Sequence, residues 1–334
     1  MWKRVRTGAQ IAFGVLAVGF LVWAIASNWS AVIKALAHMN PLFVIASVIL
    51  IFVGLYVNML SWRAVVAALG TPLTRAQAAT VFFTSQLGKY IPGGIWPVVT
   101  SARLGQAFGL AAVLSVSSMT IALLLSLTVG SVLAVGALFL VPAIAAKYSA
   151  LPIVLIALGV IALSPPVLNR LIMLALRILR RSGTLPKLAS RPFAAAIGWS
   201  IMSWLCFGVA LFLLTVASGA PVDATTLVGG ISGYALSWVA GFVAILVPAG
   251  AGVREAVLVL VLSGELAVPT VLGVAIVHRL IMTMGDVAML GFTRHSRRAT
   301  LASTPVTRAA EADLEAAVGH DAAGGHESAE ESAS

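Results

Sequence analysis

The sequence predicts an all-α polytopic membrane protein with about six full spans and two re-entrant hairpins, arranged as two inverted halves. Hydrophobic residues make up 60% of the chain and charged residues only 10%, whereas a soluble domain contains about 25% charged residues. The mean hydropathy of +1.05 agrees with this class. Two Pro/Gly breaks inside long apolar stretches predict the hairpins.

Full spans are predicted wherever an apolar run approaches the roughly 20 residues that a crossing helix needs. Six segments qualify: 8–27, 41–60, 118–143, 150–168, 193–216 and 268–291. The first follows Lys3, Arg4 and Arg6 as a signal peptide would, but its apolar run of about 18 residues is long enough to span. We interpret it as an uncleaved first helix. The stretch 111–145 could hold either one crossing or two.

The two breaks are short runs of proline, glycine and small residues. They are Ile91-Pro92-Gly93-Gly94 and Pro248-Ala249-Gly250-Ala251-Gly252. Both residue types interrupt intrahelical hydrogen bonds, and hydrocarbon offers no replacement partners, so such breaks persist only in protein or beside water. The surrounding segments, 79–110 and 225–264, each have two modest arms, which favours re-entrant hairpins. Paired interrupted segments in two halves of a membrane protein indicate a translocation site.

The basic residues predict the orientation. Every cluster of Lys and Arg falls on the cytoplasmic side if the six spans and two hairpins are correct. The halves, about 1–145 and 150–292, then repeat one order (two spans, a hairpin, one span) from opposite faces. Pro92 and Pro248 both lie 32 residues after the end of the preceding span. We therefore expect an inner (plasma) membrane protein of residues 1–292 with both termini in the cytoplasm.

The C-terminal segment, 293–334, has a different composition. Residues before 300 hold 20 of the 21 basic residues and only four of the 11 acidic ones. Ala, Ser, Gly and Glu dominate from Ala299 onward, which predicts a disordered cytoplasmic tail. The arginine-rich stretch 167–181 is typical of an interfacial helix on anionic headgroups, with a solvated loop as the alternative. Nucleic-acid binding is disfavoured, because the cations flank apolar spans.

Ionisable residues inside apolar segments are costly and are therefore candidate functional groups. Four cations stand near the two breaks and in the sixth span, against two carboxylates. This surplus suits an anionic substrate, since guanidinium binds phosphate in a bidentate manner and amides at the breaks would add donors. The candidate substrate-binding residues are Lys89, Tyr90, Pro92, Gly93, Gly94, Trp96, Arg103, Pro248, Gly250, Gly252, Arg254, Glu255, His278, Arg279 and Asp286.

Structural alternatives for these residues stay open. Lys89 could snorkel to the cytoplasmic interface. Arg254 with Glu255, and Arg279 with Asp286, could be structural ion pairs that neutralise one another. The glycines of both breaks could serve only close packing between helices.

Enzymatic signatures are sparse. HExxH, GxSxG and Walker sequences are absent, so no catalytic residue, cofactor or metal site is predicted. A GT-C glycosyltransferase would carry acidic residues in an early external loop, and residues 27–40 have none. The single cysteine, Cys206, excludes a disulfide framework and a thiolate metal cluster.

Two segments resemble the signatures of a known family. Residues 87–109 (LGKYIPGGIWPVVTSARLGQAFG) and 245–260 (ILVPAGAGVREAVLVL) are similar to those of the lysylphosphatidylglycerol synthase transmembrane-region family, also described as flippase-like. The resemblance covers about residues 8–292. His278-Arg279 resembles the family's late arginine position, and Ala249 departs from the more usual Pro-Gly-Gly.

The resemblance implies an inner-membrane protein that handles lipids. In the multiple-peptide-resistance-factor members, the similar region flips aminoacylated phosphatidylglycerol beside a soluble aminoacyl-transfer domain. Only a short tail follows the last predicted span here, so lysyl transfer is not expected.

We therefore expect translocation of an anionic phospholipid or a polyprenyl-phosphate-linked precursor across the bacterial inner membrane. The four cations would hold the phosphate and the two carboxylates would balance or release it. A glycosyltransferase or a lipid-modifying enzyme is the expected partner. One alternative is an integral membrane enzyme or glycosyltransferase accessory acting on polyprenyl-linked sugar. Another is an ion-coupled solute transporter, for which only two carboxylates are available.

Overall fold

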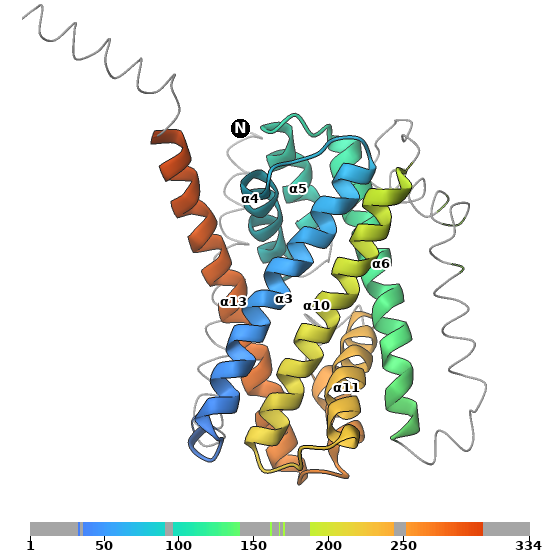
Figure 1. Cartoon of the computed structure of the whole chain (residues 1–334), viewed down its shortest axis with the longest axis vertical. Coiled ribbons are helices and arrows are strands. Elements are labelled where there is room, and N and C mark those ends of the chain that lie inside the picture. The colour runs from blue at the N-terminus through green and yellow to red at the C-terminus, as the bar shows by residue number, and fades with distance from the viewer. Residues whose placement is uncertain are drawn as a thin grey trace, which may run out of the picture.

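The computed structural model describes residues 36–90, 96–140, 188–243 and 252–302, and the single residues 33, 161, 167 and 170. Regular structure within these residues is helical, with no strand. The elements, shown in Figure 1, are α3 (Pro41–Ala68), α4 (Arg75–Gln86), η1 (Leu87–Tyr90), α5 (Trp96–Gln106), α6 (Ala112–Phe139), α10 (Ser190–Ala217), α11 (Ala224–Val243), α12 (Val253–Leu262) and α13 (Val268–Ala302).

Four of the described helices are long and apolar enough to cross a membrane. Their candidate spans are Pro41–Ala68, Ala112–Ala137, Ser190–Ala217 and Val268–Gly291. These spans coincide with four of the six predicted ones and confirm a multi-pass helical protein. The predicted spans 8–27 and 150–168 lie outside the described residues, apart from residue 161 and residue 167.

The structure answers one open question and moves one boundary. Helix α6 is a single uninterrupted helix from Ala112 to Phe139, which corresponds to one crossing. Helix α13 continues to Ala302, so the predicted start of the tail at residue 293 lies inside this helix. Residues 303–334, and all of 167–181 except residues 167 and 170, lie outside the described part of the chain.

Helices α3 and α10 form an antiparallel pair that is tied together at both ends. The N–H of Asn40 donates to the carbonyl of Ala217 (3.0 Å), and the N–H of Ala189 donates to the carbonyl of Ala68 (2.9 Å). Each contact joins the N-cap residue of one helix to the last residue of the other. Two buried serine hydroxyls of α3 also donate to α10 carbonyls at 2.9 Å, so the pair is fixed in register along its length.

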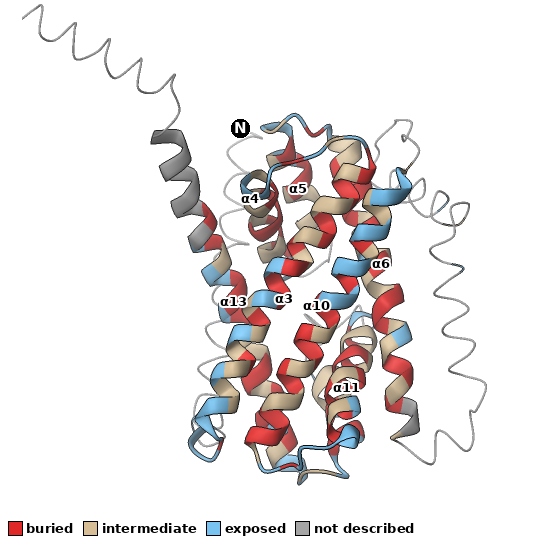
Figure 2. Ribbon diagram, viewed as in Figure 1, coloured by how far each residue is buried: buried red, intermediate tan, exposed pale blue. Residues whose placement is uncertain are grey.

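Burial separates an inner and an outer face of these helices (Figure 2). The exposed apolar residues of α3 recur every three or four positions: Leu42, Ile45, Ile49, Val53 and Tyr56. This period places them on one face of the helix. A continuous exposed apolar face fits contact with lipid.

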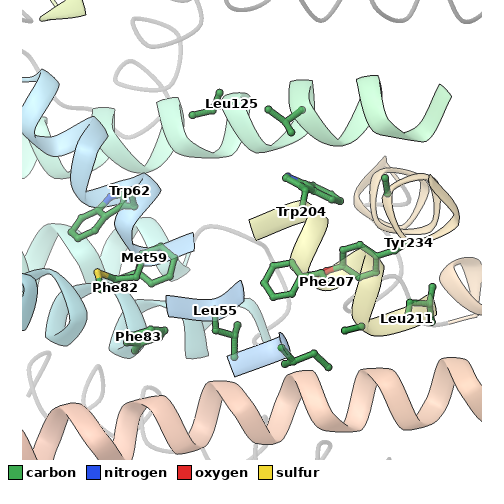
Figure 3. Close-up of a cluster of buried hydrophobic side chains, with 14 of the residues drawn as sticks. Leu55, Met59, Trp62, Phe82, Phe83, Leu125, Trp204, Phe207, Leu211 and Tyr234 are labelled. Carbon is green, nitrogen blue, oxygen red and sulfur yellow. The ribbon is translucent and has the colours of Figure 1, made fainter. Parts of the chain in front are cut away.

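The core beneath these faces is one continuous apolar cluster that includes several aromatic side chains (Figure 3). Trp62 and Phe82 lie with their ring centroids 5.8 Å apart, which joins α3 to α4. The indole Nε1–H of Trp62 donates to Ser118 Oγ at 3.1 Å, so a buried polar atom finds its partner on α6. Trp62 thereby joins α3 to both α4 and α6.

Small residues permit the close approach of α10 and α11. A Cβ on Gly208 would lie 2.6 Å from the backbone Cα of Ile231, whereas a Cβ on Gly198, in the same helix, would meet no atom within 4 Å.

We expect Gly208→Val to destabilise the detergent-solubilised protein by about 1–3 kcal/mol, because overpacking forces the backbones apart. Thermal melting of Gly208→Val and Gly198→Val checks this, and equal melting temperatures would contradict it.

The remaining described helices form two pairs, α4–α5 and α11–α12. Helices α4, α5 and α12 contain 12, 11 and 10 residues, and α11 contains 20. At 1.5 Å per residue the first three are about 15–18 Å long, well short of a hydrocarbon core of about 30 Å, whereas α11 is about 30 Å long. In Figure 1, α4 and α5 lie in the upper half of the helical body and α11 lies in the lower half.

The two arms of each pair touch near the break. A Cβ on Gly88 would lie 2.7 Å from the backbone nitrogen of Pro97 on α5, and a Cβ on Gly241 would lie 2.7 Å from Arg254 Cγ on α12. Glycine therefore brings the arms into direct contact at the positions where the sequence places its Pro/Gly breaks.

Candidate functional site

Helix α13 carries two ion pairs, one to each of the two helix pairs. Arg279 Nη1 lies 2.8 Å from Glu255 Oε1 on α12, and Asp286 Oδ2 lies 2.6 Å from Lys89 Nζ on η1. Arg279 and Asp286 are seven residues apart, which places them on the same face about 10.5 Å apart along the axis. Arg279 lies at the centre of the candidate span Val268–Gly291. One crossing helix thus connects the charged residues of both breaks.

In both ion pairs the cation is the more exposed partner. The side chains of Lys89 and Asp286 are 38% and 1% exposed. Those of Arg279 and Glu255 are 34% and 17% exposed. The two cationic side chains are therefore more accessible than the carboxylates with which they pair.

Glu255 is held by two contacts of different kinds. Its Oε2 accepts a hydrogen bond from the backbone N–H of Gly252 at 2.6 Å, and its Oε1 binds Arg279. The first contact supplies a partner for a backbone donor at the start of α12 and places negative charge at a helix N-terminus, where the helix dipole favours it. Glu255 therefore fixes the start of α12 and also orients Arg279.

Gly252 serves backbone conformation rather than packing. Its φ of 82° is in the left-handed region that favours glycine, and a Cβ there would meet no atom of a described residue within 4 Å. The backbone conformation therefore accounts for glycine at this position.

Arg254 lies against an aromatic side chain of α11. Its Cζ is 5.8 Å from the centroid of the Trp238 ring, a cation–π arrangement. The Trp238 ring stacks on Phe242, with centroids 5.6 Å apart and planes inclined by 6°. Tyr234, Trp238 and Phe242 follow one another at four-residue spacing on one face of α11. The sequence analysis missed this aromatic row, although the spacing was a visible signal.

His278 joins three helices in the interior. Its Nε2 lies 3.3 Å from the carbonyl oxygen of Phe207 on α10, which fits an Nε2–H donor. Its ring lies 5.2 Å from the Tyr234 ring on α11. The imidazole is buried, so these contacts favour a role in positioning α13 beside Arg279.

The structural ion pairs differ from those considered from the sequence. Arg279 pairs with Glu255 instead of Asp286, and Arg254 contacts Trp238 and Gly241 instead of forming an ion pair with Glu255. Lys89 pairs with Asp286, a partner that was not considered from the sequence.

The other predicted site residues are placed as follows. Arg103 is exposed in the last turn of α5 and forms no ion pair with a described residue. The backbone of Trp96 packs beside Gly88, and Tyr90 ends η1. The predicted residues Pro92, Gly93, Gly94, Pro248 and Gly250 lie outside the described residues. The structure therefore brings together Lys89, Arg254, Glu255, His278, Arg279 and Asp286, but leaves Arg103 apart.

These features define a polytopic helical membrane protein whose intramembrane charges gather where short helices meet a crossing helix. The chain matches the family described as the lysylphosphatidylglycerol synthase TM region over residues 10–288, and it belongs to that family, as the two signature segments predicted. No curated protein matches the chain. The residues that the structure describes contain no group of three or more His, Cys, Asp or Glu side chains that could hold a metal ion.

Proposed function

We propose that this protein translocates an anionic phospholipid or a polyprenyl-phosphate-linked precursor between the leaflets of the bacterial inner membrane. The supporting observation is the arrangement on α13, where Arg279 forms an ion pair with Glu255 on α12 and Asp286 forms one with Lys89 on η1. The more exposed partner is the cation in both. Intramembrane charge of this kind is expensive and marks a substrate pathway.

The order of elements supports two re-entrant hairpins in inverted halves. A 28-residue helix, a pair of helices that meet near a break, and a further candidate span occur as α3, α4–α5, α6 and again as α10, α11–α12, α13. The reciprocal end contacts of α3 and α10 are consistent with a two-fold relation between the halves. Inverted repeats with discontinuous helices at mid-membrane recur in transporters.

The ion pairs suggest how the two cations can hold a headgroup while they keep their carboxylate partners. An ammonium has three N–H donors and a guanidinium five, so each cation can hold its carboxylate and a phosphate oxygen together. Arg279 can bind phosphate in a bidentate manner. The headgroup would pass between Lys89 and Arg279 as access changes from one face to the other.

Reconstitution in liposomes tests translocation directly. We expect an acyl-labelled fluorescent phosphatidylglycerol to become accessible to an external quencher faster in protein-containing liposomes than in protein-free ones, with its mass unchanged. A new lipid product in mass spectra without a change in sidedness would contradict translocation, and would favour a membrane enzyme that modifies the lipid.

A further inference from the structure

One end of the helical body is rich in accessible arginine. We call it the arginine end and define it by four residues: Arg63, Arg75, Arg103 and Arg191. The last three are exposed, and Arg63 is partly buried. The two ion pairs among the described residues involve none of the four, and the described acidic residues lie elsewhere in the fold. This end therefore presents positive charge to its surroundings.

Hydrogen bonds bring three of these arginines together. The Nε–H of Arg63, near the end of α3, donates to the carbonyl of Leu73 at 2.7 Å, in the connection that leads to Arg75 at the start of α4. The backbone hydrogen bond between the start of α10 and the end of α3 places Arg191, in the first turn of α10, at the same end.

Arg103 reaches the arginine end through α5. A Cβ on Gly105, in the last turn of α5, would lie 2.6 Å from Ser115 Oγ in the first turn of α6. The indole of Trp62, near the end of α3, also binds α6 at Ser118. The end of α5 therefore lies close to the start of α6 and the end of α3. Figure 1 shows α4 and α5 together in the upper half of the helical body.

Helix α13 runs from the opposite end of the body to the side of the arginine end. At the opposite end, Asp223 precedes α11 and Glu265 lies between α12 and α13. Helix α13 begins after Glu265, rises to the upper half of the body in Figure 1 and ends at Ala302. It also packs against α4, whose first residue is Arg75.

The sequence after α13 has the complementary charge. Residues 303–334, which we call the acidic segment, hold seven of the 11 acidic residues and one basic residue, Arg308, so their net charge is −6. The first acidic residue, Glu311, comes nine residues after Ala302. Nine residues span up to about 30 Å, and packed helices lie about 8–10 Å apart. The acidic side chains can therefore reach α4 and α5 from the end of α13.

From this placement and charge complementarity, we propose that the arginine end binds the acidic segment of the same chain. Guanidinium groups bind carboxylates in a bidentate manner. The covalent link favours this occupant over anionic lipid headgroups, because it makes the contact intramolecular, with an effective concentration on the order of millimolar. Docking of this kind does not require lipid translocation, so its test is independent of the proposed function.

Carbodiimide cross-linking of the full-length protein in phosphatidylcholine nanodiscs tests the contact. In Arg75→Lys, the carbodiimide activates a carboxylate, the lysine amine attacks it to form an amide, and the reagent leaves as a urea. We expect mass spectra of the digest to show this lysine joined to Glu311, Asp313 or Glu315. The yield should fall about fivefold between 0.1 M and 1 M salt, since the Debye length falls from about 10 Å to about 3 Å.

Two controls separate docking from the proximity that a tether alone supplies. Val222→Lys places a lysine at an exposed position of the opposite end and should give no such cross-link. Adding Arg103→Gln and Arg191→Gln to Arg75→Lys should lower the yield about fivefold, because two cations that attract the segment are lost. An equal yield in this triple variant would overturn the proposal. No cross-link in Arg75→Lys would also overturn it, and would leave anionic headgroups as the ligand of the arginine end.

Discussion

Lys89→Met should destabilise the folded protein by about 2–3 kcal/mol, and a second change, Asp286→Asn, should restore most of the loss. Breaking a buried ion pair costs about 3–5 kcal/mol, because the remaining charge stays in the interior. We reduce this figure because Lys89 is 38% exposed and solvent screens part of the interaction. In the wild type, the buried Asp286 carboxylate lies 2.6 Å from Lys89 Nζ, and Lys89→Met leaves it without this partner. Asparagine at position 286 removes that buried charge.

Thermal melting of the detergent-solubilised single and double variants measures this coupling. Arg75→Met provides the control, since it removes an exposed cation at the start of α4. Equal melting temperatures for Lys89→Met and wild type, or a double variant no more stable than Lys89→Met, would show that the pair does not hold the first short helices to α13.

Arg279→Gln should reduce lipid translocation by about 10- to 100-fold, which corresponds to a lost contribution of about 1–3 kcal/mol from charged hydrogen bonds to phosphate. Arg279→Lys should retain part of the rate, because an ammonium keeps the charge but loses the bidentate geometry. Protein yield and membrane insertion should stay close to wild type, since Glu255 keeps its hydrogen bond from the Gly252 N–H.

A double variant separates a substrate contact from a structural one. Arg279→Gln with Glu255→Gln removes both charges of the pair, so a purely structural pair would recover much of its function in this background. If Arg279 binds the headgroup, the double variant remains slow. Wild-type rates in the double variant would contradict a headgroup role for Arg279.

The sequence predicted the helical elements well because apolar length and Pro/Gly breaks are local signals. The predicted segments 79–110 and 225–264 cover most of the two helix pairs, although α4 begins four residues earlier, at Arg75. The extent of α6 was not predictable, because an apolar stretch of that length does not distinguish one long helix from two short ones. The continuation of α13 to Ala302 was missed because its last turns lose the apolar pattern of a span.

The partners within the site were predicted less well, since pairing depends on the tertiary arrangement. Arg254 and Glu255 are adjacent in sequence, so they point about 100° apart around the helix. Arg279 and Asp286 share a face, but two helical turns separate them by about 10.5 Å. Both pairs therefore find partners on other elements, and only the packing of α12 and η1 against α13 reveals which ones.

Labelling of single cysteines at the outer ends of the short-helix pairs is the most direct test that these pairs are re-entrant and open to opposite faces. In a Cys206→Ala background, Arg75→Cys and Gln106→Cys mark the ends of the first pair, and Val222→Cys and Gly264→Cys mark those of the second. All four positions are exposed. A membrane-impermeant thiol reagent should reach the first two only from the cytoplasmic side and the second two only from outside. Labelling of the two ends of one pair from opposite faces, or of all four from one face, would contradict the inverted arrangement.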